Sequence, residues 1–206
     1  MNFIYPKLSN LDFFYVRIGG PGLGNLLYPW ARAICAAKKY NLTVINPTWG
    51  QIKFGPIIRG ENDHRNYFNI FKTNENHLSG LKKIYYNLLY NKRSEVVFNK
   101  LNREQIIRDS NTIYIFEGLG GYFKPILKKH EFLKNELLKI LNFQYKNSSD
   151  EDYIGVHLRY GDFVTTKQNT SHSFYHNILR QLRHEYSDYP IRIFSDGNYN
   201  EFSWAL

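Results

Sequence analysis

The fold class is indicated most directly by residues 13–46, which read FFYVRIGGPGLGNLLYPWARAICAAKKYNLTVIN. Aromatic and β-branched side chains over residues 13–18 predict a strand that stops at the following glycines. Over Asn25–Tyr40, apolar side chains recur at helical spacing and predict a helix with one buried face. Residues 42–46 predict a second strand. Because strand–helix–strand is the repeating unit of parallel sheets, this stretch indicates an α/β fold.

The next hundred residues continue the same pattern with less regularity. Residues 77–108 have mixed polarity and are predicted to be mostly helical. Residues 111–116 predict a further strand, and residues 132–141 predict a helix with leucines along one face. We therefore expect residues 1–146 to form an N-terminal α/β domain.

A second unit follows a polar linker. Residues 146–152 are polar and have no periodicity. Beyond them, predicted strands at 153–158 and 190–196 flank an amphipathic helix at 174–186. A doubly wound domain needs more strands than these two, so we expect residues 152–206 to be the start of a truncated Rossmann-like domain. The predicted fold class is α/β with two Rossmann-like domains, the second of them incomplete.

The overall composition is that of a globular protein with a basic surplus. The chain has 206 residues, of which 43% are hydrophobic and 22% charged, enough to bury a core. Its formal charge of +9 suits a phosphate-rich ligand, an anionic membrane surface or a nucleic acid. The basic residues are scattered in short clusters, so no nucleic-acid-binding tail is predicted.

Cysteine content and hydropathy bear on the compartment. Cys35 is the one cysteine of the chain, which excludes an internal disulfide framework and a zinc cluster built on thiolates. A reducing, cytoplasmic setting is expected. Residues 1–12 lack the charged start and apolar run of a signal peptide, and no run of 18 apolar residues predicts a membrane span.

The first candidate functional segment is the glycine loop before the predicted helix. Gly22 and Gly24 precede Asn25, where free N–H groups and the helix dipole favour an anion. The dinucleotide fingerprint is poorly matched, because Leu27 stands at its third glycine position. The loop therefore predicts either a phosphate-facing turn or a tight strand-to-helix connection.

The second segment ends the strand predicted at 153–158. His157 and Arg159 are two residues apart and project to the same side of an extended strand. An arginine at this position can bind phosphate oxygens in a bidentate way. Asp162 is placed to hold that arginine or to fix the turn at Gly161. The alternative is a surface ion pair beside a core histidine.

Two further segments also follow predicted strands. Ser195 and Asp196 end the last strand, where they fit either nucleotide contacts or a helix N-cap. Tyr122 and Phe123 follow a run of glycines after the strand at 111–116, where they fit either sugar packing or a hydrophobic plug. The histidines have no spacing typical of a metal site, so no metal is expected.

Taken in order, these segments resemble the α-1,2-fucosyltransferases of glycosyltransferase family 11 and their bacterial surface-polysaccharide relatives. The Gly-Leu-Gly-Asn loop of that family is matched by residues 22–25, and its Gly-Tyr-aromatic segment by residues 121–123. Its His-x-Arg-Arg-Gly-Asp signature is matched over residues 157–162, and its Phe-Ser-Asp-Asp strand end over residues 194–196.

The match has departures. Tyr160 stands in place of the second arginine of the signature, and Gly197 in place of the second aspartate of the strand end. A later Ser/Trp-rich segment that helps to close the donor site in such relatives has no counterpart in the 206 residues. These departures bear on the identity of the transferred sugar and on the activity of the chain.

The resemblance implies a B-type glycosyltransferase, with GDP-fucose on the C-terminal domain and the acceptor on the N-terminal domain. It implies inverting transfer in one displacement, with no cofactor and no essential metal. Arg159 would then stabilise the departing diphosphate, and His157 and Asp162 would orient it or touch the nucleotide. Asp162 is also the candidate catalytic base. Ser195 and Asp196 would contact the nucleotide.

The remaining implied contacts belong to the N-terminal domain. Gly22, Gly24 and Asn25 would approach the sugar or phosphates, and Tyr122 and Phe123 would lie on the acceptor side. The resemblance implies an oligosaccharide or lipid-linked glycan acceptor, as in surface-polysaccharide or O-antigen synthesis, and no nucleic acid partner. The basic surplus suggests peripheral contact with the inner face of the membrane.

Two alternatives stay open from the sequence. One is a transferase that uses another nucleotide sugar, which a donor panel separates from a fucosyltransferase. The other is a non-catalytic nucleotide- or glycan-binding fragment, which the few strands predicted after residue 152 favour.

Overall fold

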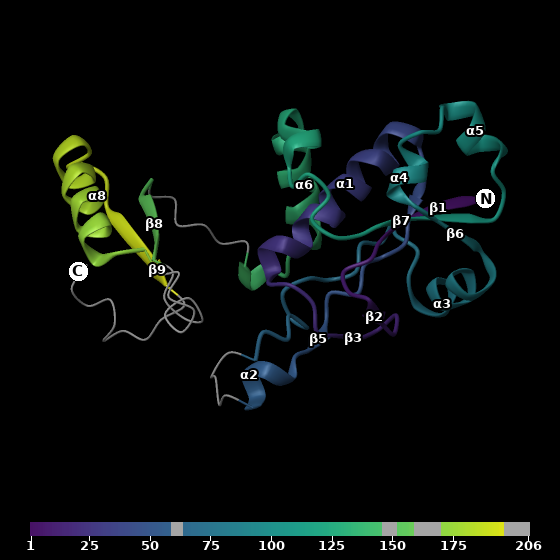
Figure 1. Ribbon diagram of the computed structural model, residues 1–206, viewed down its shortest axis with the longest axis horizontal. Helices are drawn as coiled ribbons and strands as arrows, with labels where there is room; N and C mark the ends of the chain where they lie inside the picture. Colours follow the sequence, from purple (N-terminus) through teal and green to yellow (C-terminus); the bar gives the residue numbers. More distant parts are fainter. Residues whose placement is uncertain (59–63, 146–151, 159–169, 196–206) are drawn as a thin grey trace. The chain divides into compact units, whose positions relative to one another are not determined.

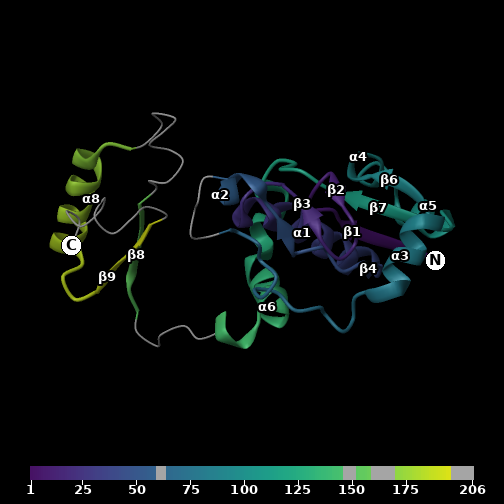
Figure 2. The same ribbon diagram turned by 90° about the horizontal axis from the view of Figure 1, so that it is seen from below.

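A computed structural model defines the fold and describes residues 1–58, 64–145, 152–158 and 170–195 (Figures 1 and 2). The chain divides into two compact units, Met1–Asn147 and Ser148–Leu206, which are described one at a time.

Unit 1 is built on a parallel sheet. Within the described residues this sheet has four strands in the order β4 (Thr43–Val44), β1 (Asn2–Pro6), β7 (Thr112–Phe116) and β6 (Asn91–Ser94). Each neighbouring pair is parallel, so all four strands end at the same edge of the sheet. The central strands β1 and β7 are the most buried.

Helices cover both faces of this sheet. Alternate residues of β1 point to opposite faces: Ile4 packs in the cluster that contains α1 (Leu23–Tyr40), while Phe3 packs against α3 (Gly80–Leu89). Trp30 and Leu26 are almost fully buried on the inner side of α1. On the other face, Phe3 contacts the ring of Tyr86 in α3 and the ring of Tyr90, the residue that follows this helix. Figure 1 shows α1 and α3 on opposite sides of the sheet.

Shorter elements complete unit 1. A small sheet has the order β2 (Leu11–Asp12), β3 (Arg17–Ile18) and β5 (Gln51–Ile52), the first pair antiparallel and the second parallel. The other helices are α2 (Phe54–Ile58), α4 (Glu95–Phe98), α5 (Arg103–Arg108) and α6 (His130–Ile140), with 3₁₀ turns at Lys124–Lys129 and Phe143–Tyr145.

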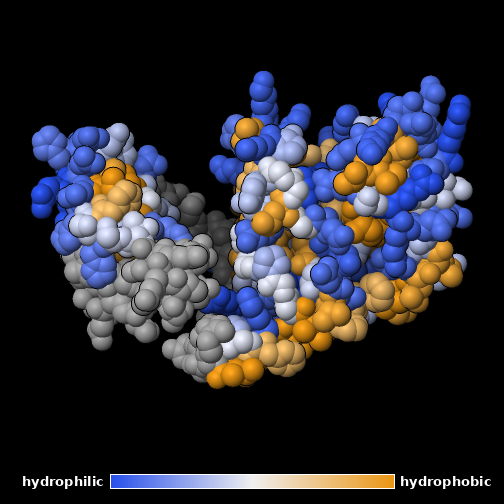
Figure 3. All heavy atoms as spheres, in the orientation of Figure 1, coloured by the Kyte–Doolittle hydropathy of each residue, from blue (hydrophilic) through white to orange (hydrophobic). Residues whose placement is uncertain are grey.

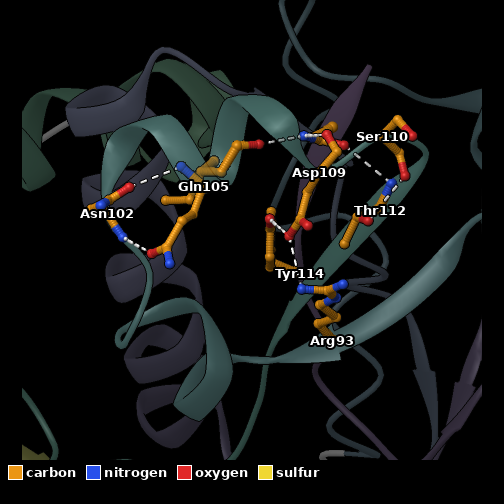
Figure 4. A network of polar contacts seen from close by, with 9 residues as sticks. Arg93, Asn102, Gln105, Asp109, Ser110, Thr112 and Tyr114 are labelled. Atoms are coloured by element: carbon orange, nitrogen blue, oxygen red, sulfur yellow. Dashed lines mark hydrogen bonds and ion pairs between the residues drawn. The ribbon is translucent and has the colours of Figure 1, made fainter.

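A polar network closes the amino end of β7 (Figure 4). Asn102 and Gln105 form a reciprocal capping box at the start of α5. Asp109 then accepts hydrogen bonds from Arg93 at 2.9 Å and from the Tyr114 hydroxyl at 2.6 Å. Burial and the nearby Asp109 raise the pKa of Tyr114 well above its usual value. This network fixes the amino ends of the strands and leaves their carboxyl ends to the loops.

Unit 2 repeats the strand–helix–strand pattern. In its described part, β8 (Ile154–Leu158) and β9 (Ile191–Ser195) are parallel, and α8 (His172–Glu185) covers one face. Val156 and Leu158 of β8 pack with Leu179 of α8 in its core.

The α/β class predicted from the sequence is confirmed, as are the helix at 25–40 and the strand at 111–116. The strand predicted at 13–18 is wrong, because only Arg17–Ile18 is extended and paired. Phe14 has a φ of 70°, and this positive φ breaks the strand in the middle of the aromatic run. The first strand of the parallel sheet is instead Asn2–Pro6, which lies at its centre beside β7 and which pattern reasoning missed.

Candidate functional site

The carboxyl edge of the unit 1 sheet carries the candidate site. In parallel α/β sheets, ligands bind outside the carboxyl ends of the strands. Two cavities open here, of about 480 and 400 Å³. Both are lined by Lys7 after β1 and Glu117 after β7, together with Asn10, so these three residues form a shared wall. The Lys7 ammonium lies 3.4 Å from the Glu117 carboxylate.

The larger cavity, which we name the glycine-side cavity, adjoins the start of α1. Its lining includes Gly20, Pro21 and Asn25 on one side and Gly118 and Leu119 on the other. Two loops rich in glycine therefore face each other across it. The sequence-predicted Asn25 is an exposed residue of the first turn of α1, and its backbone N–H bonds to the Gly22 carbonyl.

The glycines of the first loop fall into two pairs. Gly19 and Gly20 have positive φ values of 64° and 110°, and a Cβ at Gly20 would lie 2.6 Å from an Arg17 nitrogen. Their backbone needs glycine. At Gly22 and Gly24, a Cβ would meet no atom within 4 Å and φ is not positive. The packing of unit 1 therefore gives no reason for glycine at the two predicted site positions.

The second loop is held by Arg32, a residue of α1 that is only 4% exposed. Its guanidinium forms a bidentate ion pair with Glu95, with nitrogen–oxygen distances of 2.7 and 3.0 Å. It also donates to the carbonyls of residues 117, 118 and 119 at 3.0 to 3.2 Å. Arg32 thus ties α1, α4 and the loop after β7 together. The signal that sequence reasoning missed was a charge inside an apolar helical stripe.

The predicted acceptor-side residues follow this loop. Tyr122 and Phe123 pack against Tyr28 of α1, with ring centroids 5.4 and 4.4 Å apart. Tyr122 is 53% exposed and has a φ of 58°, so its ring is held outward by a backbone conformation that a non-glycine residue seldom adopts. The three rings form an exposed aromatic cluster on the helix that lines the glycine-side cavity.

The smaller cavity, which we name the β6-side cavity, lies between α3 and the ends of β1, β6 and β7. Tyr5, Asn87 and Ile115 contribute buried or half-buried lining, and Lys92 and Ser94 of β6 contribute exposed lining. Lys92 pairs in register with Ile113, so it shares the face that packs on α3. The other lining residues are Lys7, Asn10, Asp12, Phe14, Arg93 and Glu117.

A buried polar network supports this cavity. The Thr48 hydroxyl donates to Asp12 at 2.7 Å, and the Tyr5 hydroxyl also donates to that carboxylate. The Lys83 ammonium donates to Thr48 Oγ1 at 2.7 Å and to the Phe14 carbonyl at 2.8 Å. Burial lowers the pKa of Lys83 to about 8, although Asp12 opposes the shift. Burial likewise raises the pKa of Tyr5, with Asp12 adding to the effect.

Arg17 joins the network from β3 and is fully buried. It donates to the Thr48 carbonyl at 3.1 Å and to the Gly19 carbonyl at 2.8 Å. Its Nη2 has no hydrogen-bond partner among the described residues. Burial lowers the pKa of Arg17 to about 10, against the raising influence of Tyr67 and Asp12. Arg17 therefore holds the first glycine loop with its charge poorly compensated.

In unit 2, the structure places two predicted residues at one edge. His157 pairs with Phe194, and Leu158 pairs with Ser195, so both predicted residues lie at the carboxyl ends of parallel strands. His157 is exposed and lies on the face opposite α8. Ser195 alternates with Ile193 and so points to the α8 face. The two side chains leave the edge in opposite directions.

Three predicted residues, Arg159, Asp162 and Asp196, lie outside the described residues. Among the residues that the structure describes, no group of three or more His, Cys, Asp or Glu side chains is arranged to hold a metal ion. No helix in the same part of the chain combines the length and apolarity needed to cross a bilayer.

The comparisons with known proteins give one structural alignment. The chain aligns with the crystal structure of NodZ α-1,6-fucosyltransferase soaked with GDP-fucose, at 17% sequence identity and a TM-score of 0.48. The alignment covers 99% of this chain and 75% of that one. No protein-family model matches the chain, and no curated protein matches its sequence.

Proposed function

We propose that this chain is a glycosyltransferase that moves fucose from GDP-fucose to a hydroxyl of a glycan acceptor. One observation carries the proposal. The four segments that resemble family 11 are the loop at residues 22–25, the segment at 121–123, and the strand ends with His157 and Ser195. Each follows or ends a strand, and Asn25, His157 and Ser195 lie at the carboxyl edge of a parallel sheet, where α/β sheets bind ligands.

The chemistry proposed is inverting transfer in one displacement. As the bond from fucose to the diphosphate breaks, negative charge grows on the leaving phosphate oxygen. Arg159 follows β8 in the sequence and supplies the fixed positive charge that stabilises it. His157 orients this arginine or touches the nucleotide, Ser195 and Asp196 contact the nucleotide, and Asp162 takes the proton of the attacking hydroxyl.

Unit 1 supplies the acceptor side in this proposal. Gly22 and Gly24 carry no side chains and have space around them, so the N–H groups that precede Asn25 at the start of α1 are open to the sugar or phosphates of the donor. Tyr122 and Phe123 present exposed rings, on which the apolar face of an acceptor sugar packs. The acceptor proposed is an oligosaccharide or lipid-linked glycan of surface-polysaccharide synthesis.

The deciding experiment replaces Arg159. We expect Arg159→Ala to lower transfer from GDP-fucose on the order of 100-fold or more, because a preorganised charge on the leaving group is lost. Arg180→Ala is the matched control, since Arg180 is an exposed residue of α8. Product formation is followed by chromatography with GDP-fucose and, in parallel, with other nucleotide sugars.

Three outcomes test the proposed fucosyltransferase against its alternatives. Near-normal transfer by Arg159→Ala removes the mechanism. Transfer from another donor in preference to GDP-fucose moves the proposal to that sugar. Calorimetric binding of GDP without transfer by the unaltered chain identifies a non-catalytic nucleotide-binding protein.

A peripheral contact with an anionic membrane fits the exposed face of α3. Leu81, Tyr85 and Leu88 recur at helical spacing and are 79%, 58% and 70% exposed, next to the exposed Lys82 and Lys92. In Figure 3 hydrophobic surface gathers over α3. An apolar stripe flanked by cations fits a surface of anionic lipids.

Co-sedimentation with phosphatidylglycerol vesicles at two salt concentrations tests this contact. We expect the double variant Leu81→Asn with Leu88→Asn to lose most of the binding. The control is Ile107→Asn on α5, an equally exposed apolar residue away from this stripe. Equal binding by all three proteins rules the α3 surface out.

A further inference from the structure

The buried residues at the base of the β6-side cavity have no role in the proposed transfer chemistry. Tyr5 and Asn87 are each 3% exposed and line it from β1 and α3. Ile115 of β7 adds apolar surface beside them. The cavity is therefore built from side chains that the fold holds rigidly, at the edge of the sheet where ligands bind.

Asn87 is the informative residue. Its amide nitrogen donates to the Lys83 carbonyl at 2.9 Å, one helical turn earlier. Its Oδ1 has no hydrogen-bond partner among the described residues, yet it is not one of the unpaired side-chain atoms that are sealed from solvent in that part of the chain. The small exposed part of the side chain therefore includes this oxygen, where a ligand donor can replace water. Since Asn87 lines the cavity, this acceptor is available to a donor within it.

The rest of the lining mixes donors and acceptors. Lys92 has no ion-pair partner among the described residues, and Ser94 offers a hydroxyl. Asp12 and Glu117 bring two carboxylates into the same lining. Lys7 and Arg93 also line the cavity, but they are paired with Glu117 and Asp109. A phosphate group would therefore meet one unpaired cation beside two carboxylates, and it would find no use for the Asn87 oxygen, which needs a donor.

A sugar ring satisfies all of these groups together. Each hydroxyl both donates and accepts, so it can pair with an amide oxygen, a carboxylate or an ammonium group. Its C–H face packs on aromatic and aliphatic side chains such as Tyr5 and Ile115. A volume of about 400 Å³ accommodates one pyranose with room to spare.

We propose that the β6-side cavity binds one pyranose residue of a saccharide, with Asn87 and Lys92 as its principal polar contacts. In the proposed transferase this is an acceptor subsite, next to Glu117 on the wall shared with the glycine-side cavity. That biological role rests on the proposed function, whereas binding of the sugar is measured without it.

The test is ligand-observed saturation-transfer NMR on the full chain with a panel of methyl hexopyranosides and methyl N-acetylhexosaminides. We expect at least one to bind at millimolar concentration. Asn87→Leu keeps the side-chain volume and removes the free acceptor, so binding should weaken about tenfold. Lys92→Ala should weaken it several-fold, and Lys100→Ala, also an exposed lysine near the end of α4, should leave it unchanged.

Because Lys92 is exposed on an edge strand, Lys92→Ala keeps the proposal testable if Asn87→Leu unfolds. Binding by neither wild type nor variants at tens of millimolar overturns the proposal, as does wild-type affinity in Lys92→Ala. Displacement of the bound glycoside by GDP also overturns it, in favour of a phosphate site. If the chain binds the glycoside but fails to bind GDP, the sugar site in this cavity is supported and the proposed transferase function is excluded.

Discussion

Two glycine loops face each other across the glycine-side cavity, and each is held by a buried arginine. Arg32 has a carboxylate partner, Glu95, and donates to three carbonyls of the loop after β7. Arg17 has two carbonyl partners, and its Nη2 has none among the described residues. The same residue type at the same depth is thus a compensated ion pair in one loop and a poorly compensated charge in the other.

This difference teaches that burial alone does not say how firmly an arginine holds its loop. A buried charge stabilises when an opposite charge and hydrogen bonds replace the water it lost. Arg32 meets that condition. Burial lowers the pKa of Arg17 to about 10, which indicates that its charge is only partly compensated for the water it lost. We expect the loop after β7 to be the more rigid wall of the cavity.

The largest effect is expected from Arg32→Met. It leaves Glu95 without its partner and three loop carbonyls without donors, so the free energy of unfolding should fall by about 3–5 kcal/mol. Urea denaturation followed by circular dichroism measures this loss. The double variant with Glu95→Met should lose less than the single one, because no uncompensated charge is left. A loss no greater than that of the exposed control Arg108→Met would break the comparison.

Arg17→Met should cost less. The substitution leaves the Thr48 and Gly19 carbonyls without donors, but it also removes a charge that burial already disfavours. We expect a loss of about 1–3 kcal/mol in the same urea experiment. A loss equal to that of Arg32→Met would show that the two arginines are equally well compensated.

The pH dependence of stability sharpens the same contrast through Lys83, a second cation on the Arg17 side. Its folded pKa of about 8 lies below its unfolded value of 10.5, so the unfolded chain binds more protons between these values. Its contribution to stability therefore rises with pH from 8 to 10, by at most about 1.4 kcal/mol per pH unit.

Measurements stay below pH 10, because burial raises the pKa of the neighbouring Tyr5 and ionisation of tyrosines in the unfolded chain works in the opposite direction there. Lys83→Met should abolish the rise between pH 8 and 10, while the exposed control Lys82→Met should keep it. An unchanged pH profile in Lys83→Met would show that this ammonium is not the titrating group.

The smallest effects on stability are expected within the first glycine loop. Gly20→Ala should cost about 1–2 kcal/mol, since φ is 110° and the new methyl group meets Arg17. Gly24→Ala should be neutral or stabilising by up to about 1 kcal/mol, because Gly24 is helical and has space around it. If Gly24→Ala nevertheless weakens transfer or GDP-fucose binding, its glycine serves a ligand. Unchanged activity in that variant would show that Gly24 has no role beyond the start of the helix.

Sequence patterns predicted the elements whose hydrophobic pattern lies within a few neighbouring residues. The helix at Leu23–Tyr40 has a clear apolar stripe, and the strand at Thr112–Phe116 is a continuous β-branched and aromatic run. They did not predict β6, Asn91–Ser94, because its four exposed polar residues have no strand signature and pair only through their backbone. Nor did they separate Asn2–Pro6 from the more strongly aromatic residues 13–18.

The candidate site divides in the same way. The glycine loop, Tyr122, Phe123, His157 and Ser195 were predicted from residue types at strand ends. In the structure Asn25 lines the glycine-side cavity, Tyr122 and Phe123 pack against α1, and His157 and Ser195 lie at the carboxyl ends of their strands. Their proposed roles remain predictions. The buried groups that shape the cavities were not predicted, since Arg32, Lys83 and Asn87 look like ordinary polar residues of helices in the sequence.

By itself, the sequence determined the α/β class, the main helix and the order of the motif segments, because periodicity and turn residues act over a few neighbours. Only the tertiary structure decided which strand lies at the centre of the sheet and which polar side chains are buried around the cavities. Burial and ion pairing depend on residues far apart in the chain, such as Arg32 with Glu95, and these partnerships are settled only when the elements pack.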